Sequence, residues 1–102
     1  MVLVNPYYVY ILTNHAHTRF YVGSTANLEK QIARHRQQAA GSFSPAVNCT
    51  KLVFFERHDY VHFALYQERN FRHAPRDELR NMVMARNPDW LDLSMELAAL
   101  EE

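Results

Sequence analysis

The chain has 102 residues, of which 48% are hydrophobic and 13% aromatic, so it suits one folded domain and excludes a disordered segment. Its single cysteine, Cys49, excludes an internal disulfide. The longest apolar runs fall far short of the roughly 20 residues that a membrane span needs, and no signal-peptide pattern is visible. We therefore expect a cytoplasmic protein with no membrane partner.

The net charge of zero conceals an uneven distribution of charge. Residues 89–102 hold five acidic residues and no Lys or Arg. Residues 1–88 keep all 11 basic residues and the other six acids, a balance of +5. A basic body suits a polyanionic partner, although solvated surface charge is the plainer explanation.

The first quarter of the chain predicts a β-hairpin. Residues 7–13 (YYVYILT) are aromatic and β-branched, residues 15–18 indicate a turn, and residues 19–24 (RFYVGS) indicate a second strand. Side-chain alternation separates an apolar face from a face rich in phenol groups, on which Tyr10 and Tyr21 would lie together. We expect the apolar face to form the core and the phenol face to line a cleft.

A helix, a strand and two further helices follow. Asn27 can cap the first helix, in which Leu28 and Ile32 belong to the buried stripe and His35 lies on the same side. Residues 50–56 predict a third strand, and Asp59 can cap a helix that runs to residue 73. Residues 75–87 predict the last helix.

The resulting order is β-β-α-β-α-α. It predicts an α/β chain of the α+β kind, with a three-stranded antiparallel sheet flanked by helices. We expect a single domain over residues 1–102, with a core of about residues 7–94 and an acidic C-terminal tail at 95–102. Because part of that tail could reach basic surface, we expect it to weaken binding of a polyanion.

Several short motifs occur in a recognisable order. They are YVY at 8–10, YVG at 21–23, NLEK at 27–30, KLVFFE at 51–56, ALYQE at 64–68 and NPDW at 87–90. Their order and spacing resemble the GIY-YIG nuclease family, and its small stand-alone branch in particular. The resemblance covers nearly the whole chain. It implies a three-stranded antiparallel sheet with helices, and cleavage of DNA phosphodiester bonds with a divalent metal.

The resemblance also implies roles for individual residues. Tyr10 and Tyr21 match the two motif tyrosines, and Gly23 matches the motif glycine, where a side chain would crowd the site. Glu68 matches the single carboxylate that holds Mg²⁺ or Mn²⁺. His35 matches a histidine that is common after the catalytic arginine. We expect Tyr10, Tyr21, Gly23 and Glu68 to converge on one cleft.

Position 31 departs from the family's pattern. Relatives usually have an arginine there, which would stabilise negative charge in the transition state, whereas this chain has Gln31. Arg34 lies about 60° around the helix and is the candidate replacement. The residues expected to contact nucleic acid are Gly23, Lys30, Gln31, Arg69 and Arg72.

Each of these residues also has a structural interpretation. The tyrosines suit half-buried strand positions, Glu68 could pair with Arg72 at i+4, and His35 could be a packing histidine. His15 and His17 do not make a zinc site, because no paired cysteines or third ligand occur at motif spacing.

Three functions therefore stay open. The first is an endonuclease acting on DNA, on repair or recombination intermediates for example, with activity reduced by Gln31. The second is an inactive nucleic-acid-binding module of the same fold, and the third is a protein-interaction domain, against which the basic body argues. DNA is the expected partner, no small-molecule cofactor is expected, and the oligomeric state stays open.

Overall fold

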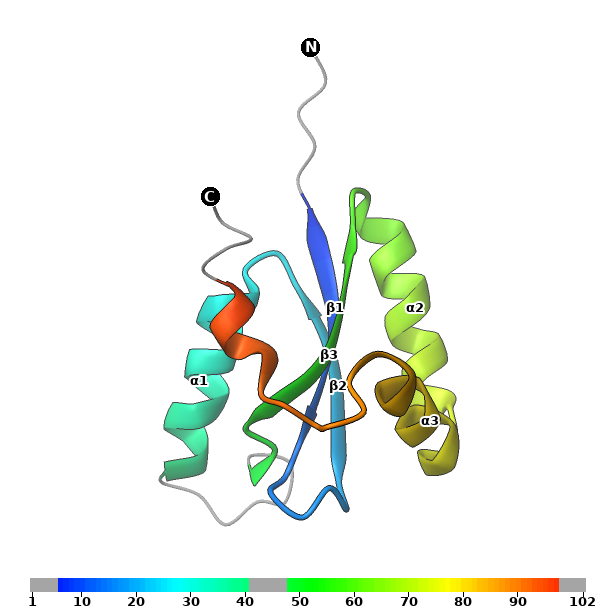
Figure 1. Ribbon diagram of the computed structural model, residues 1–102. Coiled ribbons are helices and arrows are strands. Elements are labelled where there is room, and N and C mark those ends of the chain that lie inside the picture. The colour runs from blue at the N-terminus through cyan, green and yellow to red at the C-terminus, as the bar shows by residue number, and fades with distance from the viewer. Residues whose placement is uncertain (1–5, 41–47, 98–102) are drawn as a thin grey trace.

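The computed structural model describes residues 6–40 and 48–97, apart from the side chains of residues 39 and 40. The strands are β1 (Tyr7–Thr13), β2 (Phe20–Thr25) and β3 (Lys51–His58). The helices are α1 (Leu28–Ala40), α2 (Val61–His73) and α3 (Arg76–Arg86), followed by the short 3₁₀ helix η2 (Leu93–Glu96). The strands form an antiparallel sheet in the order β2-β1-β3 (Figure 1). The expected α+β class and β-β-α-β-α-α order are confirmed.

β1 is the central strand, and helices cover both of its faces. Val9 and Ile11 are fully buried on one face, while Tyr10 and Leu12 are buried on the other. α2 and α3 pack on the first face, and α1 packs on the second (Figure 1). The phenol face is therefore a second core layer at Tyr10 and not an open cleft along its length. The reason is that the apolar stripe of α1 must itself be buried against the sheet.

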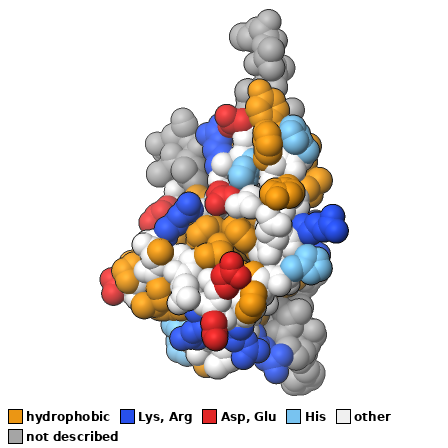
Figure 2. All heavy atoms as spheres, turned by 90° about the vertical axis from the view of Figure 1, so that its right-hand side faces the viewer, with side chains coloured by type: hydrophobic (Ala, Val, Ile, Leu, Met, Phe, Trp, Pro, Cys, Tyr) orange, Lys and Arg blue, Asp and Glu red, His pale blue; other side chains and the backbone are white. Residues whose placement is uncertain are grey.

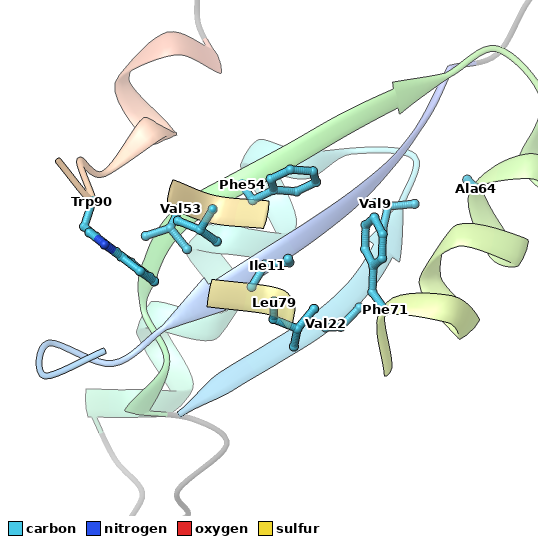
Figure 3. Packing of buried hydrophobic residues seen from close by; sticks show 10 residues of the cluster. Val9, Ile11, Val22, Val53, Phe54, Ala64, Phe71, Leu79 and Trp90 are labelled. Carbon is cyan, nitrogen blue, oxygen red and sulfur yellow. The ribbon is translucent and has the colours of Figure 1, made fainter. Parts of the chain in front are cut away.

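The larger core layer joins the sheet to α2 and α3. Its side chains come from all three strands, from both helices and from the segment after α3 (Figure 3). On α2, Ala64 and Phe71 are buried, and Gln67 and Glu68 are half-buried between them. This i, i+3, i+4, i+7 spacing turns one side of the helix toward the sheet. Glu68 consequently lies on the inner side of α2, close to the edge of β2.

α2 begins one residue later than its sequence suggests. Asp59 was expected to cap it, but the N-cap is Tyr60, whose carbonyl accepts the amide N–H groups of Phe63 and Ala64. β3 continues to His58, two residues beyond the predicted end, and Asp59 instead lies 3.6 Å from the guanidinium of Arg57. An exposed pair of this kind contributes little to stability.

The C-terminal segment packs against α1. Asp92 forms a 2.7 Å ion pair with Arg36, and Leu97 is only 4% exposed. η2 accordingly lies beside α1, on the side of the sheet away from α2 and α3 (Figure 1). The described part of the acidic tail therefore does not reach the arginines of α2 and α3. No helix in residues 6–40 and 48–97 is long and apolar enough to cross a membrane.

A β-bulge in β3 is held by Asn87. Ile11 pairs with Phe54 and Leu12 pairs with Leu52, so Val53 is the extra residue. The bulge lets Val53 and Phe54 enter the same core layer although they are adjacent in the chain. The buried Asn87 side chain donates to the carbonyl oxygens of Val53 (3.2 Å) and Leu91 (2.9 Å) and accepts from the Leu91 N–H.

We expect Asn87→Ala to lower the free energy of unfolding by about 2–4 kcal/mol, because it leaves two or more buried backbone groups unpaired. The measurement is urea unfolding followed by circular dichroism. Asn70→Ala is the matched control, since Asn70 is exposed and donates only to Gln67, and its cost should be below about 0.5 kcal/mol. Equal losses for the two variants would contradict the role assigned to Asn87.

Candidate active site at the edge of strand β2

The side chain of Tyr10 crosses β2 at Gly23. The two residues are paired in the antiparallel register, and a Cβ atom placed on Gly23 would lie 2.5 Å from the Tyr10 hydroxyl oxygen. Real Cβ atoms do not approach other atoms so closely, so Gly23 is required for space and not for an unusual backbone angle. The glycine thus allows the phenol ring to extend toward the edge of the sheet.

A polar cluster forms around the Tyr10 hydroxyl. His35, on the inner side of α1, places its Nε2 atom 3.4 Å from the Tyr10 oxygen, and its ring lies edge-on to Tyr21 at 4.6 Å between centroids. Gln31 lies one helical turn before His35, and its amide is close enough to act on the Tyr10 hydroxyl by hydrogen bonding. Tyr10, Tyr21, Gly23, Gln31 and His35 therefore come together on the α1 side of the sheet.

Burial determines the protonation of this cluster. Tyr10 is 1% exposed, and burial, reinforced by the neighbouring Tyr21 phenol and the Glu68 carboxylate, raises the pKa of its phenol far above the ordinary value. Burial also lowers the pKa of His35, which is 6% exposed, so its imidazole is neutral at pH 7. Tyr10 keeps its proton and acts as a hydrogen-bond donor. Tyr21 is only half-buried and is the phenol that a substrate could reach.

Glu68 approaches the same strand from the other side. One of its carboxylate oxygens accepts a hydrogen bond from the Ser24 hydroxyl at 2.6 Å, and the other lies 3.0 Å from the guanidinium of Arg72. Arg72 also donates from Nε to the Val22 carbonyl of β2 at 3.3 Å. The charge of Glu68 acts on Tyr10, but Tyr10 lies on the α1 side of β2 and Glu68 on the α2 side, so the expectation that Tyr10, Tyr21, Gly23 and Glu68 converge on one cleft is wrong.

Two grooves meet at Arg72. The first is lined by Tyr21, Val22 and Arg72 together with apolar residues of α2 and α3. The second is lined by residues of α2, among them Glu68, Arg69 and Arg72. An anionic group lying along these grooves would contact the Arg72 guanidinium and pass close to both Tyr21 and Glu68.

The remaining predicted residues lie outside this arrangement. Arg34 and Lys30 are exposed on α1, and neither side chain has a hydrogen bond, ion pair or ring contact with the described part of the site. Ser24 is the residue that sequence reasoning missed. Its position beside Gly23 was a usable signal, because alternation turns its side chain toward α2.

Two phenols, a neutral imidazole, a carboxylate and a guanidinium around one strand are the groups of a hydrolytic site for an anionic substrate. Residues 6–81 match the family described as the GIY-YIG catalytic domain, so the chain belongs to the GIY-YIG family. Membership indicates nuclease activity, a nucleic-acid substrate and the use of divalent metals in general terms. Comparisons with curated proteins and with solved structures found no match.

We expect Gly23→Ala to destabilise the protein by about 1–3 kcal/mol, because the new methyl group must displace the buried Tyr10 ring. Replacing the tyrosine ring at position 10 with the shorter side chain of leucine should relieve the clash with this methyl group. In a double-mutant cycle with Tyr10→Leu, the double variant should be more stable than the sum of the single effects predicts by about 1 kcal/mol or more. If the changes in the free energy of urea unfolding are strictly additive, the position of the Tyr10 ring does not depend on the absence of a side chain at Gly23.

Proposed function

We propose that the protein is a metal-dependent endonuclease that hydrolyses phosphodiester bonds in DNA, and that it belongs to the small stand-alone branch of its family. The observation that carries this proposal is the placement of Tyr10, Tyr21 and His35 on one side of β2 and of Glu68 on its other side, beside Ser24. A structural role alone does not require a half-buried phenol and a carboxylate to be held beside two grooves that share a guanidinium.

The donor set suits a metal that binds mainly through its substrate. Within residues 6–40 and 48–97 no group of three or more His, Cys, Asp or Glu side chains could hold an ion. Glu68 with the Ser24 hydroxyl provides one carboxylate and a neighbouring oxygen. This fits Mg²⁺ or Mn²⁺, because Mg²⁺ is commonly held by one or two carboxylates together with substrate phosphates and water. When bound, the ion would supply Lewis-acid stabilisation of charge on the phosphate.

The chain's own residues account for binding and proton transfer. Arg72 binds the phosphate in the shared groove. Tyr21, in its phenolate form, accepts the proton of the attacking water and becomes a neutral phenol, and the retained proton of Tyr10 stabilises the phenolate before this transfer. Neutral His35 holds the Tyr10 hydroxyl in place. Tyr21 lies two residues before Gly23 on β2, Tyr10 pairs with Gly23 from β1, and His35 lies on α1.

Catalysis is expected to be slow because Gln31 carries no charge. Arg34 is exposed and does not replace the missing guanidinium, and Arg72 is already paired with Glu68. The same observation supports a second candidate function, a nucleic-acid-binding module that has kept the grooves but does not cut. The two functions differ in whether cleavage depends on metal and on Glu68.

We expect Glu68→Gln and Tyr21→Phe each to abolish metal-dependent cleavage while leaving the fold intact. The assay incubates purified protein with supercoiled, branched and single-stranded DNA, in Mg²⁺ or Mn²⁺ and in EDTA. Glu78→Gln is the matched control, because Glu78 is an exposed carboxylate in the first turn of α3. Metal-dependent cleavage that survives Glu68→Gln would remove Glu68 from the site. DNA binding without any cleavage by the wild type would favour the binding module.

We expect Gln31→Arg to raise the cleavage rate by about 10²–10³, since a guanidinium stabilises developing phosphate charge far better than an amide. Single-turnover kinetics at saturating DNA measure the change without a contribution from affinity. The control is Ala33→Arg, which adds the same charge at an exposed position of α1. If Arg34→Gln stops cleavage and Gln31→Arg changes nothing, Arg34 has replaced the family's arginine and this explanation is wrong.

A further inference from the structure

His17, in the turn between β1 and β2, and Trp90, in the segment after α3, form an unusual pair of residues. They are the non-glycine residues with left-handed backbone angles in the described chain, with φ of 58° and 54°. Their rings stack at 4.5 Å between centroids, although they are 73 positions apart in the sequence. A left-handed backbone costs free energy for such side chains, and strain of this kind tends to be retained at functional positions.

Two cations from different elements converge on His17. The ammonium of Lys51, at the start of β3, lies 3.2 Å from His17 Nε2. Arg80 of α3 donates from Nη1 to the His17 carbonyl at 2.9 Å, and its guanidinium lies 5.5 Å from the centre of the Trp90 ring. The turn, β3 and α3 thus hold their positive groups at one place by hydrogen bonds and ring contacts.

This cluster lacks a compensating negative charge. Neither Lys51 nor Arg80 takes part in an ion pair with any acidic side chain of the described residues. Burial, followed by the charges of Lys51, Arg80 and His15, lowers the pKa of His17, and no carboxylate opposes these effects. Lys and Arg side chains also gather at the lower end of the face that carries α2 and α3, where acidic side chains lie among them (Figure 2). Uncompensated positive charge on a rigid support attracts an anion.

We propose that Lys51, Arg80 and His17 form a second phosphate-binding site, which holds the nucleic-acid backbone at a distance from the bond that is cut. The inference rests on the proposed function. It adds that the bound nucleic acid contacts the protein along β2 as far as the hairpin turn. Arg72 contacts the carbonyl of Val22, and Arg80 contacts that of His17, five residues earlier. At ~3.3 Å per residue the two contacts are at most ~16 Å apart, which corresponds to at most about five nucleotides of one strand at ~3.4 Å each.

The geometry predicts that the substrate runs from Glu68 past Arg72 to the hairpin turn. DNA that extends beyond the scissile bond in this direction should bind more tightly than DNA that ends at Arg72. Because these contacts are with phosphates, the added affinity should not depend on base sequence and should decrease as salt increases.

The experiment measures DNA affinity as a function of salt, in EDTA so that no cleavage occurs. It compares the wild type with Lys51→Gln, with the double variant Lys51→Gln/Arg80→Gln, and with the control Arg57→Gln. Arg57 is an exposed arginine near the other end of β3. Thermal unfolding checks each fold, and Lys51→Gln provides the test if loss of Arg80 from the Trp90 ring destabilises the double variant.

We expect the slope of log affinity against log salt to fall by ~0.9 for each lost phosphate contact, and so by about 2 in the double variant. Arg57→Gln should keep the wild-type slope. Wild-type affinity and slope in a folded Lys51→Gln protein would overturn the second site while leaving the proposed nuclease intact. A wild-type protein that neither binds nor cuts DNA would overturn the proposed function and this inference with it.

Discussion

The contact between the Tyr10 ring and Gly23 is the constraint on which the rest of the site depends. Tyr10 lies on the central strand and is a full member of a core layer. The absence of a side chain at Gly23 lets its hydroxyl cross the neighbouring strand and reach the edge of the sheet. One residue therefore packs the interior and presents a polar atom to the site. Substitution at either position is expected to change both stability and site geometry, because the same rigid side chain belongs to the core and to the site.

β2 is an edge strand, and the protein uses its unpaired edge. Exposed backbone groups at a sheet edge invite pairing with other chains. Here Arg72 donates a hydrogen bond to the Val22 carbonyl, and Arg80 donates one to the His17 carbonyl at the preceding turn. The same two side chains leave part of each guanidinium facing solvent, where phosphate could bind. In the proposed function the same contacts cover the edge and prepare it for an anion, which would explain why basic residues and not apolar ones occupy these positions.

Local patterns in the sequence predicted the elements, their order and the grouping of Tyr10, Tyr21 and Gly23, because alternation along two paired strands decides which side chains share a face. Non-local packing decided the rest. The burial of Tyr10 follows from the need of α1 to cover its apolar stripe, and the β3 bulge depends on Asn87, which is distant in sequence. The approach of Glu68 from the opposite face depends on the placement of α2, which no spacing within the motifs specifies.

Under the proposed function, the charges around the site give a physical reason why Gln31 would slow cleavage. The cation nearest to Glu68 is Arg72, and Glu68 already engages it at 3.0 Å. A metal at Glu68 would compete with that guanidinium for the same carboxylate, and a phosphate at Arg72 would compete for the same guanidinium. With an arginine at position 31, one cation could serve the phosphate while Arg72 stayed with Glu68. With Gln31, substrate and metal would together have to rearrange a single ion pair, and the free energy that this requires would not be available to stabilise the transition state.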